Sequence, residues 1–232
     1  MPRAWHGLSK ICCPALRHWS RRPQGPDRPG RVFLTDTPTD MAKALGFEPD
    51  PVADEPPRRN ISPGQEVVAL TADGLTRMRW GMIPVGRVNA RGRPVMETII
   101  NARSETLFGK MAFDGTGRAV LPVNGWYEWT GNARNKTAWR IKPKTGGLLL
   151  FAAITDVWET PGGTRVPQLA TVTCEPSGDV KKVHHRMAVI LRPEDVSLWL
   201  TGSGSAVTPL MRPWPNGSLL VKEAADVDWD AP

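Results

Sequence analysis

The segment Val123-Asn124-Gly125-Trp126-Tyr127-Glu128-Trp129 places one carboxylate in the most aromatic part of the chain. Surrounding an ionised carboxylate with apolar rings costs free energy, so such a group must be paired, hydrogen-bonded or raised in pKa. A raised pKa is what a general acid or base requires at neutral pH. Glu128 is therefore a candidate catalytic acid or base. The alternative is a strand-edge Glu that points to water between two core tryptophans.

A second candidate group lies at a predicted strand-to-helix junction, Asn101-Ala102-Arg103-Ser104-Glu105-Thr106. In an extended strand end, Asn101 and Arg103 are two residues apart and share a face. An amide and a guanidinium on one face can bind a phosphate or a sugar, and the helix N-terminus adds amide donors. The alternative is a helix capping box that starts at Ser104, with Arg103 on the surface.

Two of the four histidines are adjacent in Val183-His184-His185-Arg186-Met187, immediately before an apolar strand. Adjacent side chains in extended backbone point to opposite faces, so we expect one ring to face a site and the other to face solvent. This arrangement disfavours a shared metal, and no Cys/His spacing in the chain resembles a zinc site. We therefore predict no metal and no other cofactor. A polar surface histidine is the alternative for either ring.

The cysteines and the hydropathy pattern limit the class of protein. Three cysteines, Cys12, Cys13 and Cys174, give no disulfide framework and indicate a reducing, intracellular setting. A cysteine hydrolase built from Cys174 and His184 is a further alternative, although no basic neighbour lowers the pKa of Cys174 on its predicted apolar strand. No apolar run approaches the length that spans a bilayer. We expect a cytoplasmic, nucleoid-associated protein without membrane contact.

The net charge of +7 suggests a nucleic-acid partner, but the charge is unevenly distributed. Residues 1–30 hold six basic residues against Asp27 alone, whereas the remainder holds 24 basic and 22 acidic residues. Any nucleic-acid surface in the body of the protein must therefore be a local groove. We expect residues 1–29 to be a basic, Pro/Arg-rich extension that is either disordered or an artefact of a misassigned start. Residues 30–232 would form the folded domain.

The elements that must position the candidate residues are short strands separated by turns, as 23 prolines and 22 glycines suggest. A helix should begin at the Thr37 cap with Pro38 in its first position and end at Gly46. Two further helices are predicted from residue 104 or 105 to about 113 and over 193–200. Strands are predicted over 31–34, 66–70, 75–80, 118–123, 126–129, 138–141, 148–156, 168–173 and 188–191. These elements indicate a β-rich α+β single domain with a barrel-like or sandwich sheet and about three short helices.

Together, the candidate segments resemble the SOS-response-associated peptidase (SRAP) family, whose members sense abasic sites in single-stranded DNA. Six motifs carry the resemblance, in order over roughly 160 residues: Gly30-Arg31, Asn60-Ile61-Ser62-Pro63-Gly64-Gln65, Trp80-Gly81-Met82-Ile83-Pro84, Asn101–Thr106, Gly125–Trp129 and His184–Met187. The likeness fades after about Leu200. It implies an SRAP-like fold, a monomer, and single-stranded DNA with abasic sites as the partner.

The resemblance also implies a chemistry and a role for each matching residue. In the family, loss of the initiator Met leaves an N-terminal Cys, whose amine and thiol close a thiazolidine on the ring-opened abasic sugar. Glu128 would move protons on the amine and the sugar, His184 would polarise the sugar ring oxygen, and Asn101 would hold the reacting end in place. The DNA-binding residues implied are Arg31, Arg103, Arg186, Asn60 and Pro63, with phosphates bound by the three arginines.

The chain departs from the family pattern at the nucleophile, because the family's Cys maps onto Pro29 and its Met onto Arg28. Proline has no sulfur and its nitrogen is already an amide, so a thiazolidine cannot form there and the nucleophile is unknown. Four accounts remain: a misassigned start, a relative that binds abasic or single-stranded DNA without crosslinking, a fold-back of Cys12 or Cys13, or processing that exposes the secondary amine of Pro29. We therefore expect lesion binding, with a shielding crosslink where a reactive N-terminus is present; the alternative is an impaired binding module.

Overall fold

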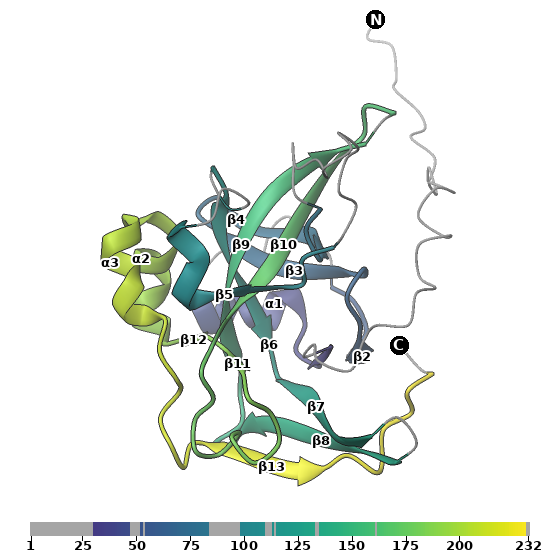
Figure 1. Cartoon of the computed structure of the whole chain (residues 1–232). Coiled ribbons are helices and arrows are strands. Elements are labelled where there is room, and N and C mark those ends of the chain that lie inside the picture. The colour runs from purple at the N-terminus through teal and green to yellow at the C-terminus, as the bar shows by residue number, and fades with distance from the viewer. Residues whose placement is uncertain are drawn as a thin grey trace, which may run out of the picture.

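The computed structural model describes residues 30–46, 52, 54–83, 98–109, 113, 115–132, 135–160 and 162–230. The predicted basic extension, residues 1–29, falls outside these ranges, so its boundary with the folded domain stays a prediction. None of the helices in the described ranges combines the length and apolar composition of a membrane span. The architecture is β-rich with a few short helices, which confirms the predicted α+β class (Figure 1).

The larger sheet closes into a barrel. Its strands are β3 (Glu66–Thr71), β4 (Gly74–Trp80), β6 (Gly117–Val123), β9 (Leu149–Glu159) and β10 (Arg165–Cys174). They follow the order β10-β4-β3-β6-β9, and the path closes because β9 also pairs with β10. Three short strands extend the barrel: β5 (Asn101–Arg103) and β11 (Met187–Ala188) pair with β10, and β12 (Ile190–Leu191) pairs with β9. The apolar centres of β3 and β9 are buried, as their sequences predict.

A second, antiparallel sheet lies at one end of the barrel, with β7, β8 and β13 at the bottom of the view in Figure 1. Its order is β13-β8-β7-β1-β2. The strands are β1 (Arg31–Leu34), β2 (Arg58–Ile61), β7 (Gly125–Asn132), β8 (Asn135–Pro143) and β13 (Leu219–Glu223). β7 is flanked by β1 and β8, so the aromatic Glu128 segment lies inside the sheet and not at its edge.

The chain passes from the barrel to the second sheet over one residue, Asn124. β6 ends just before it, and β7 begins just after it. The Asn124 Oδ1 accepts hydrogen bonds from the backbone N of Thr35 at 2.7 Å and of Asp36 at 3.2 Å. Its Nδ2 donates to Asp36 Oδ1 at 3.0 Å. These bonds fix the end of β1 against the start of β7 and so set how the two sheets meet.

The first helix, α1 (Pro38–Leu45), begins and ends as the sequence predicts. The Thr37 side chain accepts from the backbone N of Asp40, and Asp40 in turn accepts from the backbone N of Thr37, which completes a capping box. Gly46 ends the helix with a φ of 73°, in the left-handed region that glycine adopts without strain.

The other two predicted helices are 3₁₀ helices in whole or in part. The helix predicted from residue 104 or 105 to about 113 begins as a 3₁₀ helix, η2 (Ser104–Gly109), and residues 110–112 of that prediction lie outside the described ranges. The helix predicted over 193–200 divides into the 3₁₀ turn η4 (Pro193–Asp195) and α2 (Val196–Thr201), which packs on β6. α3 (Gly204–Val207), the 3₁₀ turn η5 (Thr208–Leu210), β2 and β13 are not predicted from the sequence. α2 and α3 lie together on one side of the barrel (Figure 1).

Candidate functional site

Glu128 is buried in β7, with an exposed fraction of 2%, so its interpretation as a strand-edge residue facing water is wrong. Trp126 lies two residues earlier on the same face and packs edge-on against Phe151 of the barrel. The Trp126 Nε1 donates to Glu128 Oε1 at 3.1 Å. Burial raises the pKa of Glu128 to about 8, and the Trp126 hydrogen bond opposes this only in part. Glu128 is therefore a neutral carboxylic acid at pH 7 and can donate a proton.

His184 is the titratable neighbour of Glu128, with its Nδ1 3.8 Å from Glu128 Oε1. The same nitrogen is 2.8 Å from the backbone O of Arg186. The backbone N of Arg186 also lies 3.2 Å from this nitrogen, so Nδ1 faces both an acceptor and a donor of Arg186, and its role depends on the tautomer of the ring. A distance of 3.8 Å is too long for a hydrogen bond. Glu128 and His184 are therefore close neighbours that do not hydrogen-bond directly to each other.

One histidine ring lies beside Glu128 and the other is exposed, as expected, but the extended backbone on which that expectation rested is wrong, because the two rings lie close together. Their centroids are 4.5 Å apart at an interplanar angle of 41°. The segment is a turn and not an extended strand, because the backbone N of His184 donates to Val180 O at 3.0 Å. His185 is exposed, whereas His184 is half-buried beside Glu128. In the described residues, no three His, Cys, Asp or Glu side chains are grouped to hold a metal.

Asn101 lines a small cavity that Trp126 also lines, which brings the amide close to the group that hydrogen-bonds Glu128. The cavity encloses about 20 Å³, room for about one water molecule. Asn101 Oδ1 accepts from Thr171 Oγ1 at 2.6 Å, which fixes the amide. The Nε1 of Trp80, another lining residue, is buried without a hydrogen-bond partner among the described residues. The complete lining is Arg31, Val32, Trp80, Asn101, Trp126, Phe151, Thr171, Thr173 and Ala188.

The register of β1 and β7 brings the start of the folded domain to Glu128. Arg31 pairs with Tyr127 and Val32 with Trp126, so continuing the register by one residue places Gly30 opposite Glu128. Opposed residues in antiparallel strands have Cα atoms about 4.5–5.5 Å apart. The described chain therefore begins, at Gly30, across from the β7 position that carries Glu128. The residue before Gly30 is Pro29, the family's nucleophile position, which lies outside the described ranges.

Two of the predicted phosphate-binding arginines differ in their surroundings. Arg186 forms a two-point ion pair with Glu105 and donates through Nη2 to Thr173 O at 2.5 Å. This pair lowers the pKa of Glu105 to about 2. Arg186 thus fastens η2 to β10, and its contact with a phosphate stays a prediction. Arg103 is exposed and lies on the same face of β5 as Asn101, as its spacing predicts.

Arg31 and Asn60, the other predicted DNA-binding residues with side-chain donors, are both engaged by the chain's own C-terminal segment. Arg31 Nη1 donates to Asn60 Oδ1, and Asn60 Nδ2 donates to the backbone O of Trp229 at 2.6 Å. The Arg31 guanidinium also lies over the Trp229 ring, 5.6 Å from its centroid. Pro63 is half-buried in the turn after β2. Sequence reasoning missed Trp229; the alternation of acidic and apolar residues near it was the available signal.

Cys174 does not have the properties of a nucleophile. Its side chain is buried, and burial raises the pKa of the thiol to about 12. Its Sγ donates to Glu175 O at 3.3 Å. Because the thiolate is the nucleophilic form, a thiol that stays protonated gives no support to a cysteine hydrolase built from Cys174 and His184.

Comparisons with known proteins identify relatives in several organisms. The chain is 34% identical to abasic site processing protein YobE of Bacillus subtilis (strain 168) over 152 residues, which is 62% of this chain and 68% of that protein. It is 33% identical to abasic site processing protein YoaM of the same organism over 158 residues, 65% of this chain and 68% of that protein. With abasic site processing protein HMCES of Gallus gallus the identity is 28% over 150 residues, covering 54% of this chain and 45% of that protein.

Solved structures share the fold. A protein from Bacteroides thetaiotaomicron superposes with a TM-score of 0.73 at 21% identity, over 84% of this chain and 92% of that one. A phage-related protein from Bordetella bronchiseptica gives a TM-score of 0.65 at 25% identity, over 85% and 94% of the two chains. The family described as SOS response associated peptidase (SRAP) matches this sequence over residues 29–226, nearly the whole predicted domain. The chain belongs to the SRAP family.

Proposed function

We propose that this protein recognises abasic sites in single-stranded DNA and that Glu128 and His184 transfer protons at the damaged sugar. The names of its relatives support the abasic site as the lesion that is recognised, since YobE, YoaM and HMCES are abasic site processing proteins. The observation that carries the proposal is the buried carboxyl of Glu128, whose pKa is raised to about 8 and which lies 3.8 Å from His184. An acid of that pKa is matched to proton transfer near neutral pH.

The chemistry of an abasic sugar needs one acid and one base. Its closed form opens to an aldehyde when the C1–O4 bond breaks, the ring oxygen takes up a proton and the C1 hydroxyl loses one. Glu128, protonated at pH 7, supplies the acid, and the adjacent imidazole of His184 supplies the base. Asn101, fixed by Thr171, is placed to hold the sugar beside them. The absence of a base on the sugar lets it enter a site that has little free space.

Covalent capture is a further step of the proposal and depends on the residue before Gly30. A free amine there would attack the aldehyde carbon and release water to form an imine, and the β1–β7 register, which runs toward Glu128, supports this step. A second candidate function is lesion binding without chemistry. Pro29 favours it, because as part of a longer chain its nitrogen is an amide and it carries no thiol.

One experiment separates the two candidates. The purified protein is incubated with a single-stranded oligonucleotide that carries one abasic site, and with the same oligonucleotide left intact. Lesion chemistry gives a heat-stable adduct or cleavage of the abasic strand alone, and mass spectrometry of the adduct identifies the attached residue. Binding without chemistry gives only a salt-sensitive shift in mobility, stronger for the abasic strand. Equal behaviour of the two strands would contradict the lesion-recognition proposal.

A further inference from the structure

The C-terminal segment, residues 224–230, returns to the sheet formed by β1, β7 and β8 and ends beside it (Figure 1). The backbone N of Ala224 donates to Ala138 O at 2.8 Å, which starts the contact. The Trp229 ring then packs edge-on against Tyr127, with centroids 5.0 Å apart, and tilted against Trp129 at 5.4 Å. Tyr127 and Trp129 point away from the face that holds Glu128, because they alternate with it along β7. The segment therefore covers the outer face of this sheet.

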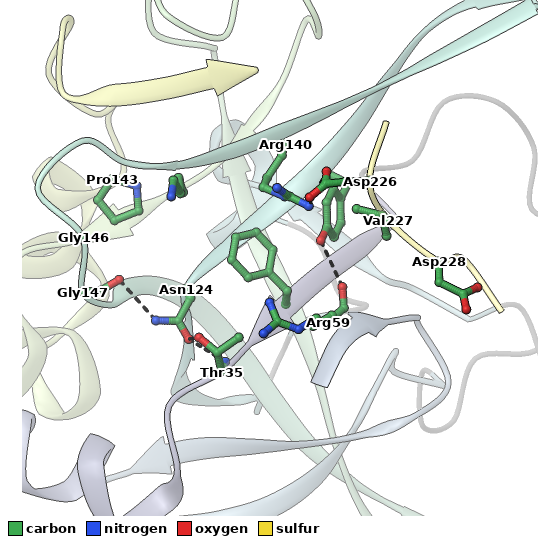
Figure 2. Close-up of a pocket in the computed structure, with 13 residues that line it drawn as sticks. Thr35, Arg59, Asn124, Arg140, Pro143, Gly146, Gly147, Asp226, Val227 and Asp228 are labelled. Atoms are coloured by element: carbon green, nitrogen blue, oxygen red, sulfur yellow. Dashed lines mark hydrogen bonds and ion pairs between the residues drawn. The ribbon is translucent and has the colours of Figure 1, made fainter. Parts of the chain in front are cut away.

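Acidic side chains of the segment meet basic side chains of the sheet. Asp226 Oδ1 accepts from Arg140 Nη2 at 2.9 Å, and Figure 2 shows the two groups in contact. Asp230 lies close enough to Arg31 to oppose the lowering of the Arg31 pKa that burial causes. Trp229 stacks on the same guanidinium. The segment thus presents carboxylates and one aromatic ring to cations and aromatic rings of the sheet.

A hollow of about 540 Å³ opens on this outer face. It is lined by Phe33, Thr35, Arg59, Asn124, Tyr127, Arg140, Lys142, Pro143, Gly146, Gly147, Asp226, Val227 and Asp228. Its cations are Arg59 of β2 and Arg140 and Lys142 of β8, and Figure 2 shows the two arginines at the hollow. Its apolar surface includes the rings of Phe33 and Tyr127. The acidic residues of its lining belong to the C-terminal segment. Without that segment, the surface combines positive charge with exposed rings.

Positive charge that tracks a backbone, combined with rings on which bases stack, is how proteins bind single-stranded nucleic acid. A single strand presents the complementary features, which are anionic phosphates and flat bases. The segment Asp226-Val227-Asp228-Trp229-Asp230 resembles a strand in this respect, because its carboxylates alternate with apolar residues that include one aromatic ring. We propose that the outer face of β1, β7 and β8 is a docking surface for single-stranded DNA, and that residues 226–230 occupy it in place of the strand. This proposal rests on the proposed function and adds Arg59, Arg140 and Lys142 to the strand-binding residues.

The surface is continuous with the candidate site through one residue. Arg31 lines the small cavity beside Asn101 and Trp126, and it also contacts Trp229 on the outer face. A strand whose abasic sugar lies at Glu128 can therefore continue past Arg31 onto the outer face. The C-terminal segment and a DNA strand cannot occupy this surface at the same time. Only molecules with an uncovered surface can bind the strand there, so the apparent affinity falls in proportion to the uncovered fraction.

The test neutralises the segment without changing its shape. A variant with Asp226→Asn, Asp228→Asn and Asp230→Asn is compared with a control that makes the same change in charge at exposed positions elsewhere, Asp73→Asn, Glu159→Gln and Glu194→Gln. The probe is a fluorescent single-stranded oligonucleotide without a lesion, and affinity is measured by anisotropy at several salt concentrations. The segment variant should bind at least about fivefold more tightly than the control. Equal gains in the two variants would show only a general charge effect and would overturn the proposal.

A second arm tests the new cations. Lys142→Ala, added to the segment variant, should remove most of the gain, whereas Lys43→Ala on the exposed side of α1 should not. The gain in affinity of the segment variant should be smaller for duplex DNA of the same sequence than for the single strand, because paired bases cannot stack on the rings. Two outcomes would contradict a single-strand surface on this face: an equal loss of affinity in the two lysine variants, or a gain in affinity for the duplex equal to that for the single strand.

A third arm needs no substitution. Adding the oligonucleotide to the unmodified protein should speed hydrogen exchange at residues 224–230, including the Ala224 amide that bonds to Ala138. Slower exchange there would show that the segment is part of the bound surface and would overturn displacement. Abasic-strand processing is assayed in parallel. If it persists while the segment variant matches its control, only the docking surface is wrong; if no variant binds or processes abasic DNA, the proposed function fails as well.

Discussion

Glu128 owes its raised pKa to the loss of water around the carboxyl and not to a nearby anion, since burial is the largest cause. Trp126, two residues earlier on the same face of β7, contacts the carboxyl, so a raised pKa could be expected from the aromatic segment Gly125–Trp129 alone. Its relation to His184 could not be derived from spacing, because 56 residues and a change of sheet separate the two. Only the family resemblance placed them in one site.

The raised pKa makes stability depend on pH. Between the unfolded pKa of about 4.3 and the folded value of about 8, the folded protein keeps a proton that the unfolded chain releases. The stabilisation is thus present in full below the unfolded pKa and is lost as pH rises to about 8, at up to about 1.4 kcal/mol per pH unit. Glu128→Gln should flatten this dependence and should be more stable than the unmodified protein at pH 8. Urea denaturation at pH 5, 6.5 and 8 measures it; an unchanged slope would contradict the assignment.

The same substitution should separate chemistry from binding. Glutamine keeps the size of the side chain and an oxygen that can accept from Trp126, but it cannot release a proton. Glu128→Gln should slow processing of an abasic strand by about 100-fold or more while its affinity changes by less than about twofold. The exposed Glu66→Gln serves as the control. Parallel losses of rate and affinity would assign Glu128 a structural role.

Arg103 is exposed beside Asn101 and should act through phosphates. Arg103→Ala should weaken the binding of abasic and intact single strands alike and should reduce the slope of log affinity against log salt by about 1. Arg165→Ala, an exposed arginine at the far end of β10, is the matched control. A loss confined to the abasic strand would instead place Arg103 at the sugar. Titrations from 50 to 200 mM salt distinguish these outcomes.

At the scale of elements, the close approach of β1, β7 and β8 depends on Gly125. A Cβ added there would lie 2.3 Å from Ile141 O and 2.5 Å from the Phe33 ring. Gly125→Ala should therefore destabilise the fold by about 1–3 kcal/mol or more, as overpacking does. Gly109→Ala, where a Cβ meets no atom of the described residues within 4 Å and φ is not positive, should be nearly neutral. Thermal unfolding of the two variants tests this; equal melting temperatures would show that the strands can separate without cost.

Elements with local signals were predictable, and those that depend on distant pairing were not. The capping box at Thr37 and the Ala72-Asp73-Gly74 turn specify α1 and the β3–β4 hairpin from a few adjacent residues. β13 carries no such signal, because its place is set by pairing with β8, about 80 residues earlier. The path of the C-terminal segment is set in the same way by Asn60 and Tyr127. The barrel class followed from the number of short strands, but its closure through β9 and β10 did not.

For the whole molecule, the distribution of charge should govern association with DNA. Residues 1–30 contribute five of the seven net positive charges. A variant that lacks residues 1–29 should bind intact single strands less tightly and show a flatter salt dependence, by about 0.7 in slope for each phosphate that is no longer neutralised. Its preference for abasic over intact strands should be unchanged, since that preference is assigned to the folded domain. A change in the preference, measured at constant salt, would place part of lesion recognition in the extension.

The pairing of β1 with β7 fixes the position of the start of the folded domain relative to Glu128. Strand register fixes which residue stands across from Glu128, and a slip of one residue would turn every β1 side chain to the other face. Backbone pairing between β1 and β7 therefore sets how far the start of β1 lies from the Glu128 carboxyl, whatever residues precede β1. The position counted back from Arg31, and not the identity of the residue that occupies it, therefore decides what lies across from Glu128.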